Sequence, residues 1–136
     1  MTVTALLVSH DGARWLPAVL AGVAAQHRRV DAFLAVDTGS GDASADLIAR
    51  AWGEGSVHVV DSSTTYPQAV RAGLAELARL APVASDDEWI WLLHDDANPH
   101  PDALLALIGM IEATYTRRPR TKTGRGSTTR KLPVPP

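Results

Sequence analysis

The sequence contains no cysteine, which excludes disulfide bonds and thiolate metal ligands and is compatible with a reducing cytosol. It also lacks any stretch near the roughly 20 apolar residues that a membrane-spanning helix needs. The first residues, MTVTALLVSHDGARW, carry no basic leader, and their apolar run is too short for a secretory signal. We therefore expect no transmembrane segment and a cytoplasmic location, with the cytoplasmic face of the membrane as a further possibility.

Acidic residues are absent from the last part of the chain. All 15 lie at or before Glu112, together with six of the 13 basic residues, so this part has a net charge of −9 and the remainder of +7. A chain of 136 residues is long enough for one ordinary domain and short for two. We therefore predict one folded domain over residues 1–112 and a basic tail over residues 113–136.

The tail has two glycines and four prolines from Thr114 onward, few large apolar residues and no periodicity. This composition predicts disorder. Basic tails can bind nucleic acid or anionic membranes, but this one lacks interleaved aromatic residues apart from Tyr115, and no nucleic-acid partner is expected. Another interpretation is that the chain is incomplete, or that its reading frame is lost near Arg120.

Four short apolar runs alternate with four segments of helical period. The runs are residues 3–9, 32–36, 57–60 and 88–93, and the helical segments begin near Leu16, Ala45, Val70 and Pro101. Apolar runs of this length are typical of strands covered on both faces. The alternation predicts an α/β fold, namely a mostly parallel, Rossmann-like sheet of about four strands with helices on both faces.

Polar residues follow each predicted strand. Ser9, His10 and Asp11 follow the first, Asp37 the second, residues 61–63 (Asp-Ser-Ser) the third, and His94, Asp95 and Asp96 the fourth. Ligands of open α/β sheets bind beyond the carboxyl ends of the strands. Carboxylates gathered there, without thiols, suit a hard divalent cation such as Mg²⁺ or Mn²⁺.

Several of these residues also have purely structural interpretations. Ser40 or Asp42 is expected to be an N-cap, Asp11 with Gly12 could form only a turn, and Arg71 could be a solvated helix residue. The adjacent carboxylates of Asp95 and Asp96 favour a functional interpretation, because like charges side by side are unfavourable unless a positive partner lies against them.

Four segments, in the right order over about residues 2–111, resemble family 2 glycosyltransferases of the GT-A fold. VTALLVSHDGARWLPAVLAGVAAQ is similar to the family's first strand and helix, and AVDTGSGDASADLI to its second motif. YPQAVRAGLAEL is similar to the segment before the fourth strand. WLLHDDANPHPDALLAL resembles the Asp-x-Asp strand end and the proline-containing helix start after it.

This resemblance implies a nucleoside diphosphate sugar donor, of uridine or deoxythymidine type, and transfer of the sugar to an acceptor hydroxyl with inversion. The acceptor, a glycan or a lipid-linked molecule, is left open. A metal held by carboxylates would neutralise the charge that develops on the diphosphate. The resemblance implies Asp96 as metal ligand, Asp95 as a contact to the ribose or to a water molecule beyond the metal ligands, and Asp37 as a base or ribose contact. It also implies that Ser9, His10 and Asp11 form the loop of the nucleoside pocket and that Arg71 contacts the base or a phosphate.

Two departures from the family pattern matter. His94 stands where the family often has its first Asp, so we count His94 with Asp96 as a metal ligand and leave the metal identity open. The family's second half, which carries the acceptor site and the general base, is absent, so the catalytic base is unassigned and the chain is expected to be incomplete for transfer. Two alternatives stay open, a non-catalytic nucleotide- or metal-binding module and a metal-dependent hydrolase that uses residues 94–96.

Overall fold

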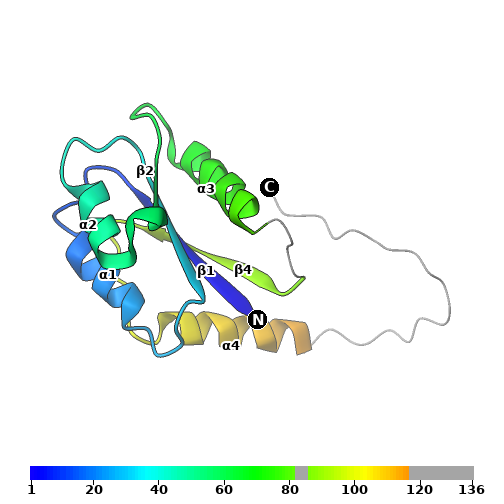
Figure 1. Ribbon diagram of the computed structural model, residues 1–136. Helices are drawn as coiled ribbons and strands as arrows, with labels where there is room; N and C mark the ends of the chain where they lie inside the picture. The colour runs from blue at the N-terminus through cyan, green and yellow to red at the C-terminus, as the bar shows by residue number, and fades with distance from the viewer. Residues whose placement is uncertain (82–85, 117–136) are drawn as a thin grey trace, which may run out of the picture.

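The computed structural model describes residues 1–81 and 86–116 (Figure 1). Its strands are β1 (Thr2–Ser9), β2 (Ala32–Asp37), β3 (Val57–Val59) and β4 (Glu88–His94). Its helices are α1 (Leu16–Ala24), α2 (Ser44–Trp52), α3 (Tyr66–Leu80) and α4 (Ala103–Thr116), with a short 3₁₀ helix at Glu54–Ser56. The predicted α/β alternation is therefore confirmed.

The four strands form one parallel sheet in the order β3-β2-β1-β4. From the central strand β1 the chain moves to β2 and β3 on one side, then crosses back through α3 to β4 on the other side. In register, Ser9 of β1 lies opposite Asp37 of β2, and Val8 lies opposite His94 of β4. The direction of winding thus reverses between β1 and β4, which is where doubly wound sheets open a crevice.

Helices cover both faces of the sheet (Figure 1). Side chains alternate between faces along a strand, so Ala5 and Leu7 of β1 pack with α1 and α2. Leu6 and Val8 point to the other face, where the buried Ala69 of α3 packs against them. This alternation explains why β1 is apolar at nearly every position.

The start of α2 differs from the prediction. The sequence predicts Ser40 or Asp42 as its N-cap, but the helix begins at Ser44, and the residue before it, Ala43, provides no side-chain cap. Asp42 accepts hydrogen bonds from the backbone N–H and hydroxyl of Ser44, and Ser40 bonds to Asp37 instead. The physical reason is that the side chains of Ser40 and Asp42 form hydrogen bonds that stabilise the loop between β2 and α2. By contrast, α3 has a complete capping box between Thr65 and Gln68.

The last strand is covered on one face only. Trp89, Trp91 and Leu93 pack toward α4 or α1, whereas Ile90 and Leu92 on the opposite face are 40% and 48% exposed. The expectation that this strand is covered on both faces is thus wrong at Ile90 and Leu92, because α3 lies over β1 and β2 and leaves β4 uncovered.

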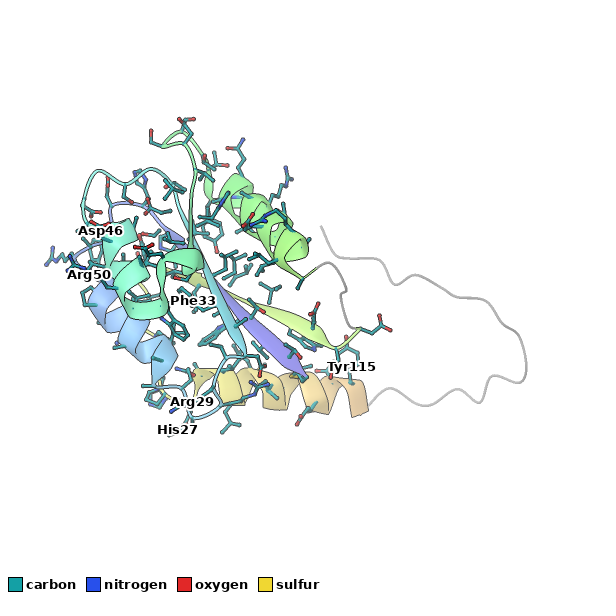
Figure 2. The ribbon with its side chains drawn as sticks, in the orientation of Figure 1. His27, Arg29, Phe33, Asp46, Arg50 and Tyr115 are labelled. Carbon is teal, nitrogen blue, oxygen red and sulfur yellow. The ribbon has the colours of Figure 1, made fainter. Side chains whose placement is uncertain are left out.

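Helix α4 extends farther than its apolar period indicates. The period ends at Ile111, but the helix continues to Thr116. Near its end, Tyr115 packs edge-on against Trp89 with ring centroids 6.0 Å apart (Figure 2), which gives this turn a tertiary contact. The expectation of disorder for the rest of the tail concerns residues 117–136, which lie outside the described residues. Within the described residues, no helix has the length and apolar character to cross a membrane.

Candidate functional site

A crevice lies beyond the carboxyl ends of β1, β2 and β4, at the reversal between β1 and β4. Its volume is about 240 Å³. It is lined by residues from three strand ends, from the loop after β3 and from the first turn of α3, namely Val8, His10, Thr38, Ser62, Thr64, Tyr66 and His94. The lining combines hydroxyl groups with aromatic rings, a mixture that suits a ligand with a planar ring and polar edges.

The loop after β1 is tightly packed against the end of β4. Gly12 is buried, and a Cβ atom on it would lie 2.3 Å from Oδ2 of Asp95. Asp11 has a positive φ of 46°, a conformation that Asp adopts more readily than most residues. The sequence predicts that Asp11 and Gly12 could form a turn. The structure adds the reason for glycine at position 12, because a larger residue would not fit beside Asp95.

Several side chains tie the loop after β1 to the loop after β2. The Ser40 hydroxyl accepts the backbone N–H of Asp11, and the carboxylate of Asp11 accepts the backbone N–H of Gly41. Asp42 accepts the N–H of Ala13, and the hydroxyl of Ser44 donates to its other oxygen. The Ser44 hydroxyl holds the pKa of Asp42 below its ordinary value, and the backbone N–H groups add to this effect.

Asp37 lies at the end of β2 and is buried. One carboxylate oxygen accepts the backbone N–H of Ser40 at 2.9 Å, and the other accepts the Ser40 hydroxyl at 2.6 Å. These bonds satisfy the buried carboxylate locally. A ligand contact by Asp37 would therefore share an oxygen with Ser40.

Asp95 lies just beyond the end of β4 and is only 3% exposed. Its Oδ2 accepts the backbone N–H of His10 at 2.8 Å, which joins the end of β4 to the loop after β1. Its Oδ1 lies 3.0 Å from Nδ1 of His94. The carboxylate thus has one oxygen bonded to the loop after β1 and one beside the imidazole of His94.

His94, Asp95 and Asp96 form a compact group of possible metal ligands. Nδ1 of His94 is 2.8 Å from Oδ1 of Asp96 and 3.0 Å from Oδ1 of Asp95, and the ligand atoms of all three residues lie within 4.8 Å of one another. Carboxylate oxygens with one imidazole suit Mn²⁺ and related divalent ions. The donor set therefore fits a divalent cation, and the half-exposed His94 and Asp96 leave it accessible.

Aromatic rings border this group on the crevice side. The Tyr66 ring lies against the His94 ring, with centroids 5.6 Å apart and planes inclined by 31°. His10 also lines the crevice, and its Nδ1 is 2.7 Å from the hydroxyl of Thr38. The orientation of both histidines is therefore set by neighbours from other elements of the fold.

The remaining predicted site residues lie apart from the crevice lining. Ser9 is fully buried on the α1 and α2 side of β1, and within the described residues its hydroxyl has no hydrogen-bond partner. Arg71 is exposed on α3, more than one turn beyond Tyr66, and does not line the crevice. Of the predicted site residues, only His10 and His94 line the crevice, and Asp95 and Asp96 lie beside His94. Ser9, Asp11, Asp37 and Arg71 are not part of the lining.

Sequence reasoning did not select Thr38, Ser62, Thr64 or Tyr66, although all four line the crevice. A usable signal existed for Tyr66, because Thr65 and Gln68 form a capping box in TTYPQ and place Tyr66 in the first turn of α3. Ser62 and Thr64 belong to an irregular loop, and no local pattern indicates which way such side chains point.

The comparisons with known proteins agree with this architecture. The crystal structure of residues 1–349 of TarS from S. aureus, a glycosyltransferase, superimposes with a TM-score of 0.60 at 13% sequence identity. The alignment covers 85% of this chain and 33% of the TarS structure, so the chain spans about a third of that structure's length. No protein-family model and no curated protein matches the chain.

At this identity the likeness concerns the fold alone. The chain therefore has a glycosyltransferase-like, Rossmann-like α/β fold.

Proposed function

We propose that this chain is the donor-binding part of a family 2-like glycosyltransferase and binds a nucleoside diphosphate sugar together with a divalent metal. The observation that carries the proposal is the position of the His94–Asp96 group beside a hydroxyl- and aromatic-lined crevice, at the reversal of the sheet. The glycosyltransferase-like fold supports the same class of ligand.

The crevice is suited to part of such a donor. Its volume of about 240 Å³ is below the roughly 300–1,000 Å³ of sites that enclose a complete drug-sized ligand. In this proposal the nucleoside base lies between the rings of His10 and Tyr66, and the ribose meets the side of Asp95 and Asp37. Ser9 and Asp11 position the loop that carries His10. Arg71 would reach a base or phosphate only from outside the crevice lining.

The diphosphate is placed over His94 and Asp96 in this proposal. His94 and Asp96 would hold the cation, which would supply positive charge to stabilise the negative charge that develops on the diphosphate as the sugar–phosphate bond breaks. Asp95 holds the end of β4 against the loop after β1 through its bond to the His10 N–H. His94 and Asp96 therefore stay in a fixed position relative to His10. Transfer with inversion also requires a general base near the acceptor hydroxyl, which we assign to no residue of this chain.

Calorimetric titration of uridine diphosphate in the presence and absence of Mn²⁺ tests donor binding. We expect binding that strengthens with Mn²⁺, and we expect Asp96→Ala to weaken the Mn²⁺-dependent part at least tenfold. Asp46→Ala, which removes an exposed carboxylate on α2 (Figure 2), is the matched control and should change nothing. The absence of binding at millimolar uridine diphosphate and deoxythymidine diphosphate would refute the proposal.

A non-catalytic nucleotide-binding module is the second candidate, because the described residues provide a binding crevice without an assigned base. Both candidates predict nucleotide binding. Turnover of a nucleoside diphosphate sugar, by hydrolysis or by transfer, separates them, because a binding module releases no nucleoside diphosphate.

A further inference from the structure

The loop between β4 and α4 carries Asp96 and is anchored directly before it. Asp95 is buried, accepts the backbone N–H of His10 and lies against Gly12. Asp96 follows with an exposed carboxylate, whose Oδ1 lies 2.8 Å from Nδ1 of His94. The position of Asp96 therefore depends on what holds the loop on its other side.

On that other side the loop lies directly against helix α1. Gly22 of α1 has no side chain, and a Cβ atom there would lie 2.1 Å from Oδ1 of Asn98 and 3.2 Å from Cδ of Pro99. Glycine inside a helix is less favourable than alanine, so this position has a cost that the close approach of the loop explains. The second anchor thus comes only two residues after Asp96.

Gln26 extends this contact from the end of α1 to the start of α4, which lie beside each other in Figure 1. Its side chain is only 3% exposed. The amide group donates to the carbonyl oxygens of Gly22 at 3.0 Å and His100 at 2.7 Å, and the amide oxygen accepts the backbone N–H of Leu104 at 3.0 Å. The first N–H groups of a helix have no partner within the helix, so Gln26 satisfies one of them in α4 while holding the loop.

Asp96 is thus an exposed residue with an anchored position close by on each side. We propose that Gly22 and Gln26 are positioning residues for the divalent-cation site. They hold the loop after β4 so that the carboxylate of Asp96 stays beside the imidazole of His94. This inference rests on the metal binding of the proposed function. Fixing a loop in its binding conformation lowers the entropy cost of binding, and contacts that orient metal ligands typically change the metal affinity by about 10–100-fold.

Binding of Mn²⁺ alone to the full 136-residue chain, followed by electron paramagnetic resonance of the free ion, tests this role. Gly22→Ala places a methyl group against Asn98 and pushes the loop away from α1, and we expect the Mn²⁺ affinity to fall about tenfold. Gly109→Ala is the matched control, because Gly109 also lies within a helix and a Cβ atom there meets nothing within 4 Å. It should leave the affinity unchanged. Circular dichroism verifies that both variants are folded.

Asn98→Ala separates a positional effect from a loss of stability. It removes Oδ1 and Cγ of Asn98, so that Cδ of Pro99, at 3.2 Å, remains as the neighbour of a Cβ atom at Gly22. The double variant Gly22→Ala with Asn98→Ala should therefore regain the Mn²⁺ affinity of Asn98→Ala alone. A merely structural role of Gly22 predicts a changed unfolding temperature with an unchanged Mn²⁺ affinity.

Gln26→Met tests the second positioning residue. Methionine nearly keeps the length of the side chain but removes the three hydrogen bonds of the amide. We expect a lower Mn²⁺ affinity together with a lower unfolding temperature, because the buried N–H of Leu104 loses its acceptor. Ile48→Val is the control for lost stability, since Ile48 is fully buried on α2 and lies outside the loop. It should leave the affinity unchanged.

The unchanged protein distinguishes the two ways in which the inference can fail. If it binds no Mn²⁺, the metal site of the proposed function is refuted and the positioning role falls with it. If it binds Mn²⁺ and Gly22→Ala binds equally well, only the positioning role is overturned. An affinity that stays low in the double variant, or that falls equally in Gly109→Ala or Ile48→Val, would overturn it as well.

Discussion

The carboxylate of Asp95 accepts a hydrogen bond from the backbone N–H of His10 over 2.8 Å, although the two residues are 85 positions apart in the sequence. This bond joins the end of β4 to the loop after β1, directly at the reversal of the sheet. Of the adjacent carboxylates, the buried Asp95 therefore supports the structure, whereas the exposed Asp96 faces solvent beside His94.

Replacement of Asp95 should lower stability more than replacement of its neighbour. Asp95→Ala removes the acceptor of the His10 N–H, and hydrogen bonds to charged groups contribute about 1.5–3 kcal/mol. We expect the free energy of unfolding in urea to fall by about 2 kcal/mol. Asp96→Ala is the control, and because its side chain is exposed, a change within about 0.5 kcal/mol is expected. Equal losses in the two variants would contradict the structural role of Asp95.

Gly12 should tolerate no side chain. A Cβ atom there would lie 2.3 Å from Oδ2 and 2.6 Å from Cγ of Asp95, and Asp95 is buried and cannot move aside freely. We expect Gly12→Ala to destabilise the protein by about 1–3 kcal/mol, as overpacking usually does. Gly55→Ala is the matched control, because a Cβ atom at Gly55 meets nothing within 4 Å. Thermal melting that shows equal effects for the two variants would refute the close packing.

Ser9→Ala should be neutral or slightly stabilising. The Ser9 hydroxyl is fully buried, and within the described residues it has no hydrogen-bond partner. Burying an unbonded hydroxyl costs free energy, so removing the hydroxyl removes that cost and breaks no hydrogen bond. The equally buried Ser44 differs, because its hydroxyl accepts the Gly12 N–H and donates to Asp42. We expect Ser44→Ala to lower the urea midpoint clearly.

The same pair of variants addresses ligand binding. If Ser9 acts only by positioning the loop through its backbone, Ser9→Ala leaves the affinity for uridine diphosphate unchanged. A large loss of affinity without a loss of stability would instead assign its hydroxyl to the ligand.

Asp31 should make stability depend on pH in the acid range. The backbone N–H of Val3 donates to Asp31 at 2.7 Å, and with Arg28 it holds the pKa of this carboxyl below its ordinary value of 3.8. A carboxyl with a lowered folded-state pKa stabilises the protein above its unfolded-state pKa, and this contribution is lost as pH falls through the folded-state pKa. We expect Asp31→Asn to flatten the decline of the unfolding midpoint between about pH 5 and pH 2.

Arg28→Gln is the informative comparison for Asp31. It removes the hydrogen bond from Arg28, which lowers the pKa of Asp31 less than the bond from the Val3 N–H does. The decline of the unfolding midpoint at low pH should therefore become shallower without disappearing. A decline that stays the same in Asp31→Asn would show that other carboxyls dominate the acid response.

Much of the candidate site follows from local sequence, and part of it does not. His10, Asp37 and residues 94–96 are predictable because each follows an apolar run, and the structure places all of them at the carboxyl edge of the sheet. The capping box of Thr65 and Gln68 predicts only that Tyr66 lies in the first turn of α3. That Thr64 and Tyr66 line the crevice is not predictable, because it depends on where the start of α3 lies relative to the sheet. The different roles of Asp95 and Asp96 are not predictable either. The two residues are identical and adjacent in the sequence, and they differ only in their tertiary contacts.

The sequence by itself determined the order of strands and helices, because short apolar runs and the 3.6-residue period are properties of neighbouring positions. It also determined which residues meet at one edge, because all strands of a parallel sheet end on the same side. Only the tertiary structure decided that β4 lies beside β1 with one face uncovered, that Asp95 is bonded to His10 and that Ser9 is buried. Those outcomes depend on contacts between residues far apart in the chain, for which no local period exists.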